Sequence, residues 1–118
     1  MYRWSVFVSD GRRSDLLPGT LELLVLKTLS LGELHGYGIA QYIQRLSRDV
    51  LRIEEGSLYP ALQRLQLKGL IKSKWGHTPT RRRARYYTIT AAGRKQLGEE
   101  TSSYERVVAA MALVLKSQ

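Results

Sequence analysis

The stretch that decides the fold runs from Glu54 to Tyr87 and reads EEGSLYPALQRLQLKGLIKSKWGHTPTRRRARYY. Its first half contains leucines at four- and three-residue spacing, which places them on one face of a helix: Leu58, Leu62 and Leu65. Pro60 lacks an amide hydrogen and is tolerated only near a helix start, so this helix should begin close to Gly56. Lys68-Gly69 is a typical helix end, a cation followed by a residue that tolerates positive φ.

The second half of the stretch has the pattern of a two-stranded ribbon. Leu70, Ile71 and Trp75 are spaced among lysines as in a strand, and the segment 76–80 is rich in turn residues. The segment 85–90 then alternates β-prone residues, as a returning strand would. Three arginines stand at the tip between the two strands: Arg81, Arg82 and Arg83. The stretch therefore predicts a helix, a turn and a ribbon with a basic tip.

The charge of the chain is concentrated in this same region. The 118 residues include 19 Lys and Arg against 10 Asp and Glu, a net charge of +9. Residues 56–98 contain ten of these cations and no acid, so the rest of the chain nets −1. A merely soluble surface usually mixes both signs. A field of one sign favours a polyanionic partner, and nucleic acid is the commonest one.

These residues resemble the PadR-type transcriptional regulators. The resemblance rests on GTLELLVLKTLSLGELHGYGIAQYI, on IEEGSLYPALQRLQLKGLI, and on Trp75 followed by RRRARYYTIT, and it runs from Leu16 to Leu97. It implies a winged helix-turn-helix domain, and a homodimer joined by the C-terminal helices in the branch of the family with one short C-terminal helix. The family's members are mostly repressors, many of them released by a small molecule or a stress signal.

The expected fold is mainly α with a small β-ribbon. We expect an N-terminal arm (residues 1–15), a winged helix-turn-helix domain (16–90) and a dimerisation helix (91–118). Thr20 is the candidate N-cap of a first helix that is apolar nearly all round and hence buried between other helices. A second helix should span residues 37–46. Arg52-Ile53 could form a strand edge that pairs with the later ribbon.

The helix after Glu54 is the expected reader of the DNA major groove, because it is narrow enough to enter that groove. With the leucines buried, its outward side would hold Ser57, Tyr59, Ala61, Arg64 and Lys68. Ser57 and Tyr59 are then candidates for base-edge contacts, and Arg64 and Lys68 for phosphate contacts. The alternative for Tyr59 is packing against the second helix.

Further candidate DNA-binding residues come from the wing and from the second helix. Arg81, Arg82 and Arg83 could enter a minor groove or clamp phosphates, with Arg85 following on the strand. Tyr37, at the start of the second helix, could reach a phosphate, or it could be a partly buried ring. Trp75 is expected to cover the small core.

The last helix, from Thr90 to Gln118, carries a coiled-coil-like seam at 4-3-4-3-4 spacing: Leu97, Thr101, Tyr104, Val108, Met111 and Leu115. Because a small domain cannot bury this seam alone, a two-fold homodimer is expected. The alternative is a helix that folds back on its own domain. An apolar gap in the dimer, lined by Tyr104 and Met111, could take a small-molecule inducer, whose identity the sequence does not indicate.

Several functional classes are disfavoured by composition. The chain has no cysteine, its two histidines are far apart, and its basic half has no carboxylate, which argues against an enzyme and against a metal or cofactor site. No apolar run reaches the roughly 18 residues of a membrane span, and a cytoplasmic protein is expected. The remaining rival is a basic winged-helix protein that binds RNA or the ribosome, although Tyr86 and Tyr87 are its only paired stacking candidates.

The N-terminal arm allows two interpretations. It is either a disordered extension or a segment with contacts of its own. In the second case Trp4 and Phe7 would pack on the dimer, or Arg12 and Arg13 would touch the DNA backbone; Trp4, Val6, Phe7 and Val8 could also form a short strand.

Overall fold

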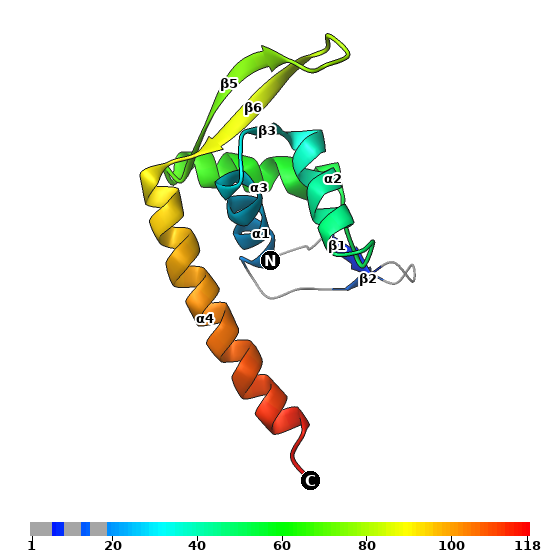
Figure 1. Cartoon of the computed structure of the whole chain (residues 1–118), viewed down its shortest axis with the longest axis vertical. Helices are drawn as coiled ribbons and strands as arrows, with labels where there is room; N and C mark the ends of the chain where they lie inside the picture. Colours follow the sequence, from blue (N-terminus) through cyan, green and yellow to red (C-terminus); the bar gives the residue numbers. More distant parts are fainter. Residues whose placement is uncertain (1–5, 9–12, 15–18) are drawn as a thin grey trace.

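The computed structural model describes residues 6–8, 13–14 and 19–118 (Figure 1). Within these residues the helices are α1 (Thr20–Ser30), α2 (Gly36–Leu46), α3 (Glu55–Leu67) and α4 (Ala91–Leu115). The strands are β1 (Val6–Val8), β2 (Arg13–Ser14), β3 (Leu34–His35), β4 (Leu51–Ile53), β5 (Ile71–His77) and β6 (Arg83–Ile89). The predicted architecture, mainly α with a small ribbon, is confirmed.

The core lies where α1, α2 and α3 meet the base of the ribbon. Helices α1 and α3 contribute four buried apolar side chains each, and α2 contributes two. The three leucines predicted to form the inner face of α3 are among them. The cluster contains Leu21, Val25, Leu26 and Leu29 from α1, Ile39 and Ile43 from α2, Leu58, Ala61, Leu62 and Leu65 from α3, and Ile71 and Tyr87 from the ribbon. Burial of these side chains removes apolar area from water, which is the main force holding the three helices together.

The wing is the antiparallel ribbon of β5 and β6, to which the short β3 adds on the other side of β6. The register pairs Trp75 with Arg85 and His77 with Arg83. At the tip, the Thr78 amide donates to the Arg82 carbonyl at 2.8 Å, and Arg81 takes a φ of 64° to complete the turn. In Figure 1 the ribbon projects above the helices.

A second sheet corrects one expectation about strand pairing. Arg52-Ile53 was expected to pair with the ribbon, but β4 pairs with β1, in the order β2-β1-β4. A one-turn connection after α2 directs β4 away from the wing, so the N-terminal segment supplies its partner. A short strand, one of the possibilities considered for the apolar residues of the arm, is therefore present at residues 6–8. Trp4 and Arg12 lie outside the described residues, and the contacts suggested for the side chains of Phe7 and Arg13 stay predictions.

The helix starts follow local capping chemistry. The His35 Nδ1 accepts a hydrogen bond from the Gly38 amide at 2.9 Å and caps α2, a role that the sequence did not suggest. Thr90 caps α4 as predicted, because its hydroxyl accepts from the Gly93 amide at 3.0 Å. The prediction that Thr20 caps α1 is wrong. Thr20 is the first helical residue, and Gly19, at a φ of 85°, precedes it without a side-chain cap.

The direction of α4 is fixed at its first turn. Thr90 donates from its amide to the Leu70 carbonyl at 3.0 Å and from its hydroxyl to the Gly69 carbonyl at 2.7 Å. Gly93 is buried there, and a Cβ on it would lie 2.1 Å from the Leu70 oxygen. From this joint α4 runs past α1 and extends beyond the other helices (Figure 1).

In the part of the chain that the structure describes, no helix combines the length and apolar character needed to span a bilayer.

Candidate nucleic-acid interface

A cleft of ≈ 1180 Å³ separates the wing from the N-terminal ends of α2 and α3. Side chains from three parts of the chain line it. The wing contributes Arg82, Arg83 and Arg85, α2 contributes Tyr37, and α3 contributes Tyr59. The structure therefore brings together five of the predicted DNA-binding residues. Glu55, in the first turn of α3, is the carboxylate among the cleft's described lining residues.

Trp75 organises two of the wing arginines. The guanidinium carbons of Arg83 and Arg85 lie 4.2 and 4.8 Å from the centre of its ring, within cation–π range. Trp75 is 53% exposed, so the expectation that it covers the core is wrong. Alternation puts Trp75 on the same side of β5 as the buried Ile71, but the ribbon extends past the core, and at Trp75 this side lines the cleft. The indole holds both guanidinium groups on that side.

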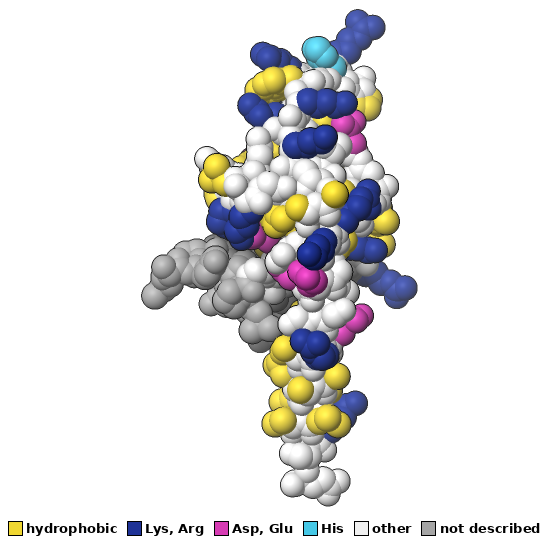
Figure 2. Space-filling view, turned by 90° about the vertical axis from the view of Figure 1, so that its left-hand side faces the viewer, with side chains coloured by type: hydrophobic (Ala, Val, Ile, Leu, Met, Phe, Trp, Pro, Cys, Tyr) yellow, Lys and Arg dark blue, Asp and Glu magenta, His cyan; other side chains and the backbone are white. Residues whose placement is uncertain are grey.

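A hydrogen-bonded chain links the wing to α3. The Arg85 Nη1 donates to the Ser73 Oγ at 2.8 Å, and the Ser73 hydroxyl donates to the Gln66 Oε1 at 3.3 Å. The two remaining arginines of the tip, Arg81 and Arg82, are exposed around the turn. The wing thus presents two guanidinium groups held over Trp75 on its strands and two exposed ones in the turn at its tip. Figure 2 shows Lys and Arg side chains gathered at the wing end of the molecule.

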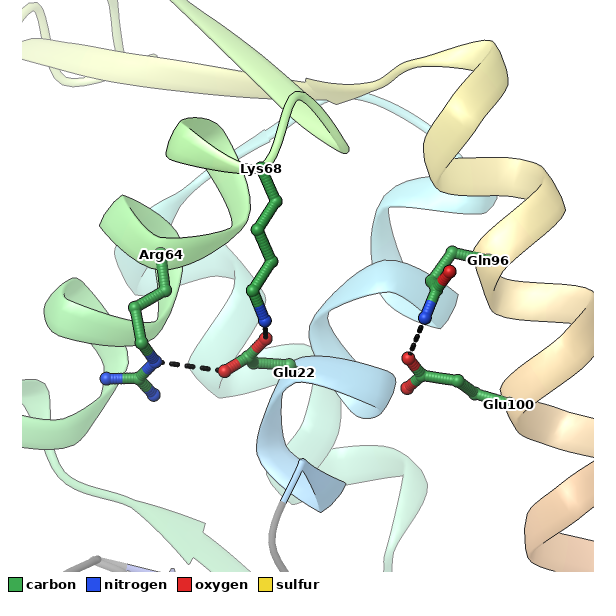
Figure 3. A network of polar contacts seen from close by, with 5 residues as sticks. All are labelled: Glu22, Arg64, Lys68, Gln96 and Glu100. Carbon is green, nitrogen blue, oxygen red and sulfur yellow. Dashed lines mark hydrogen bonds and ion pairs between the residues drawn. The ribbon is translucent and has the colours of Figure 1, made fainter.

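Arg64 and Lys68 are both paired with one carboxylate of the protein itself. The Arg64 Nε and the Lys68 Nζ lie 2.9 and 3.0 Å from the two carboxylate oxygens of Glu22 on α1 (Figure 3). Glu22 is buried, and its side chain is only 10% exposed. A buried charge is stable only when it is paired, so Glu22 requires these two cations. A phosphate contact by Arg64 or Lys68 would therefore have to compete with this carboxylate.

The outward side of α3 differs from the predicted one. Ala61 was expected to face outward, but it is fully buried. Ser57, one turn before Ala61, is half-buried on the same side, and its predicted base contact stays a prediction. Arg64 is partly exposed and Lys68 is exposed, but both lie on the side of α3 that borders α1, where they bind Glu22. The exposed arc instead carries Gly56, Tyr59, Pro60, Gln63 and Leu67.

Tyr59 combines both roles that the sequence allowed. Its ring edge approaches Gly36 so closely that a Cβ on Gly36 would lie 2.8 Å from the phenol oxygen. The side chain nevertheless remains 47% exposed toward the cleft. Packing against the start of α2 therefore orients the ring. Tyr37 beside it is 62% exposed, so its hydroxyl is free to meet a ligand.

Tyr87 lies beneath this surface and is buried, because neighbouring residues of a strand face opposite sides and Tyr87 is on the side that meets the core. Its burial raises the pKa of the phenol above the ordinary value; Arg85 lowers this pKa and Tyr59 raises it. Tyr86 faces the other way, where its ring meets the His35 ring at a centroid distance of 5.4 Å and its hydroxyl donates to the His77 carbonyl. The pair thus joins the wing to the core.

The predicted seam of α4 divides into two parts. Leu97 and Thr101 are half-buried, and Leu97 packs against the core of its own domain. Tyr104, Val108, Met111 and Leu115 are exposed by 44, 43, 48 and 79%. Figure 2 shows apolar side chains gathered on the lower half of this helix. Within the described residues, nothing covers that half.

Helices α1–α3 with a β-ribbon wing define the class of winged-helix domains. The model of the transcriptional regulator PadR-like family matches residues 25–99, well over half of the chain. The protein belongs to this family, whose members are transcriptional regulators and not enzymes.

Relatives with known sequences and structures agree with this assignment. The chain is 30% identical over 95 residues to an uncharacterized protein of Lysinibacillus sphaericus, covering 80% of this chain and 87% of the relative. It is 37% identical over 87 residues to a transcriptional regulator of Mycobacterium tuberculosis, covering 74% and 78%.

Two solved structures share the fold and 30% of the sequence. The first, a transcriptional regulator from Clostridium thermocellum, superposes with a TM-score of 0.79 over 87% of this chain and 100% of its own. The second, a PadR-like transcriptional regulator from Bacillus cereus, superposes with a TM-score of 0.75 over 89% and 100%. These likenesses extend along most of the chain, so they include α4 as well as the wing.

Proposed function

We propose that this regulator binds double-stranded DNA in a sequence-specific way and acts as a homodimeric repressor. One observation carries the DNA-binding part: three wing arginines and the N-terminal end of α3 open on the same cleft. An α-helix and a basic wing on one surface can meet a major groove and the adjacent backbone together. In this arrangement Tyr59 contacts base edges, and the arginines neutralise phosphates.

The dimer part rests on the uncovered half of α4. Its apolar residues occupy a stripe at coiled-coil spacing and are exposed in the single chain. A second copy that pairs along this stripe would bury it, and a two-fold axis would place two α3 helices on one side. Such a dimer would bind an inverted repeat with half-sites about one helical turn apart.

Release by a small molecule or a stress signal is the least determined part of the proposal. A groove of ≈ 310 Å³ lies between the start of α1 and the middle of α4, and Tyr104 lines it with Leu23, Ser103 and Val107. A ligand in this groove would contact the helix that joins the two copies. The absence of tryptophan from α4 makes a flat aromatic ligand a poorer fit than a compact apolar one.

An RNA-binding role is the alternative. Binding to unpaired bases would need aromatic faces exposed on the sheet. The exposed indole on the ribbon, Trp75, has two guanidinium groups over its ring, which leaves it less accessible to a base. Duplex DNA is therefore favoured, and competition between duplex DNA and RNA of the same sequence distinguishes the two.

The test is selection of bound duplexes from a random pool, followed by anisotropy titrations of the selected site over a salt series. We expect an inverted repeat and an affinity that falls steeply with salt, because phosphate binding releases counterions. Arg82→Ala and Arg83→Ala should weaken binding to every sequence and lower the salt slope by about one for each phosphate that is no longer neutralised. Arg106→Ala, on α4 and outside the cleft, is the matched control. No enrichment of any duplex, or no response to salt, would refute DNA binding.

A further inference from the structure

Gln63 stands in the middle of the exposed arc of α3, one turn after Tyr59. At 3.6 residues per turn, positions 59 and 63 lie one above the other on the same face. Among the residues that the structure describes, no side chain is paired with the Gln63 amide. The sequence pattern alone did not single it out, because charge drew attention to Arg64 beside it.

The two flanks of this arc are both held by the protein itself. On one flank Glu22 binds Arg64 and Lys68 at 2.9 and 3.0 Å, which ties α3 to α1 (Figure 3). On the other flank the Gln66 Oε1 accepts from Ser73 of the wing. Between these attachments, the long polar side chain that points outward and remains free is Gln63 among the described residues of α3.

We propose that Gln63 is a specificity-determining residue that contacts a base edge, and that Glu22 holds Arg64 and Lys68 as positioning residues for α3. This inference rests on the proposed DNA binding and deepens it. The amide of glutamine offers one donor and one acceptor side by side, which matches the N6 and N7 atoms of adenine in the major groove. The expected target is therefore an A·T pair next to the position read by Tyr59.

The role of the Glu22 network follows from charge. One carboxylate offsets the charge of only one of the two cations, so the cluster neutralises fewer phosphates than two free cations would. The network also ties α3 to α1, since both cations are on α3 and the carboxylate is on α1. Arg64 and Lys68 thus help to set which residues face the groove, and each contributes less to phosphate binding than a free arginine of the wing.

The first experiment compares Gln63→Ala with Gln96→Ala by selection of bound duplexes and by titration of the site selected by the wild type. For Gln63→Ala we expect loss of preference at one position of each half-site and a specificity ratio lower by roughly tenfold, the usual range for one bidentate base contact. Gln96→Ala, the same substitution on α4 and outside the cleft, is the control and should keep the wild-type preference. An unchanged base preference in Gln63→Ala, or a shift in Gln96→Ala as large, overturns the assignment.

The second experiment measures the salt slope for Arg64→Ala, Lys68→Ala and Arg82→Ala. Arg82→Ala should lower the slope by about one, whereas each of the other two should lower it by less. Glu22→Gln separates the roles further by removing the negative charge that holds both cations. We expect a lower ratio of specific to non-specific binding, while non-specific binding is at least as tight as in the wild type. A slope lowered as much by Arg64→Ala as by Arg82→Ala, or tighter specific binding for Glu22→Gln, overturns the positioning role.

These outcomes remain distinct from failure of the proposed function. If the wild type selects no duplex at all, DNA binding itself is refuted. If it selects a site that Gln63→Ala recognises equally well, DNA binding stands and the role of Gln63 is refuted. Circular dichroism and thermal unfolding of each variant establish that the comparison is made between folded proteins, and alanine at an exposed helical position should not weaken the helix.

Discussion

Helix α1 and the last part of α4 have almost the same apolar character, yet their surroundings are opposite. Leu21, Val25 and Leu26 of α1 are at most 1% exposed, because α2, α3, α4 and β6 surround that helix. Leu113, Val114 and Leu115 of α4 are exposed by 76, 72 and 79%. The comparison teaches that an apolar helix predicts burial but does not identify the surface that buries it. The single chain covers α1 and leaves the end of α4 exposed.

The largest expected effect is the difference in unfolding free energy lost when a leucine is truncated in each of these two helices. Leu26→Ala removes a fully buried side chain, and we expect a loss of about 2–5 kcal/mol in the free energy of unfolding. Leu113→Ala should change it by less than about 0.5 kcal/mol at concentrations where the protein is a monomer. Urea unfolding at low protein concentration measures both. Equal losses for the two variants would mean that α4 is packed within its own chain.

Two glycines of α4 test which part of that helix packs against its own domain. Gly93→Ala would push a methyl group into the Leu70 carbonyl, and we expect a loss of about 1–3 kcal/mol from overpacking. Gly98→Ala meets no atom within 4 Å and should stabilise the protein by about 0.5–1 kcal/mol. Thermal unfolding of the two variants gives the sign directly. A neutral Gly93→Ala would show that the joint between α4 and the ribbon is loose.

Association through α4 is tested by a charge on its exposed stripe. Met111→Asp would place a carboxylate in the proposed apolar interface, and we expect the dissociation constant of the dimer to rise at least about tenfold, or 1.4 kcal/mol. Sedimentation equilibrium measures this constant. Glu105→Asp is the control, because it changes a side chain on the same helix and keeps its negative charge. A wild type that stays monomeric at every concentration would contradict the dimer and leave the apolar stripe without an explanation.

The smallest expected effect concerns pH. Burial raises the pKa of Tyr87, so the folded state keeps this phenol neutral after the unfolded chain has begun to ionise it. The associated stability is fully present below the unfolded pKa and is lost as the pH rises through the folded one, in the range above about pH 10. Tyr87→Phe should reduce the loss of unfolding free energy between pH 9 and about pH 11. Identical pH profiles for the variant and the wild type would contradict this assignment.

Much of the candidate interface could be predicted from local pattern. The basic segment without acids and the alternating strand residues predicted the wing. The expected helix starts predicted the positions of Tyr37 and Tyr59. The errors came from long-range contacts. Ala61 was expected to face outward and is buried. Arg64 and Lys68 are not free to bind phosphate as expected, because both bind Glu22, more than forty positions earlier in the chain. Gln63 was missed because an uncharged side chain leaves no signal in a charge count.

The sequence by itself determined the helices, the ribbon, the cap at Thr90 and the segregation of positive charge, since each depends on periodicity or on neighbours a few residues away. Only the tertiary structure decided which face of α3 turns outward, that β4 pairs with β1, and that two arginines gather over Trp75. These features depend on pairs of residues far apart in the chain. Their geometry exists only after the core has packed and fixed the rotation of each helix and the register of each strand.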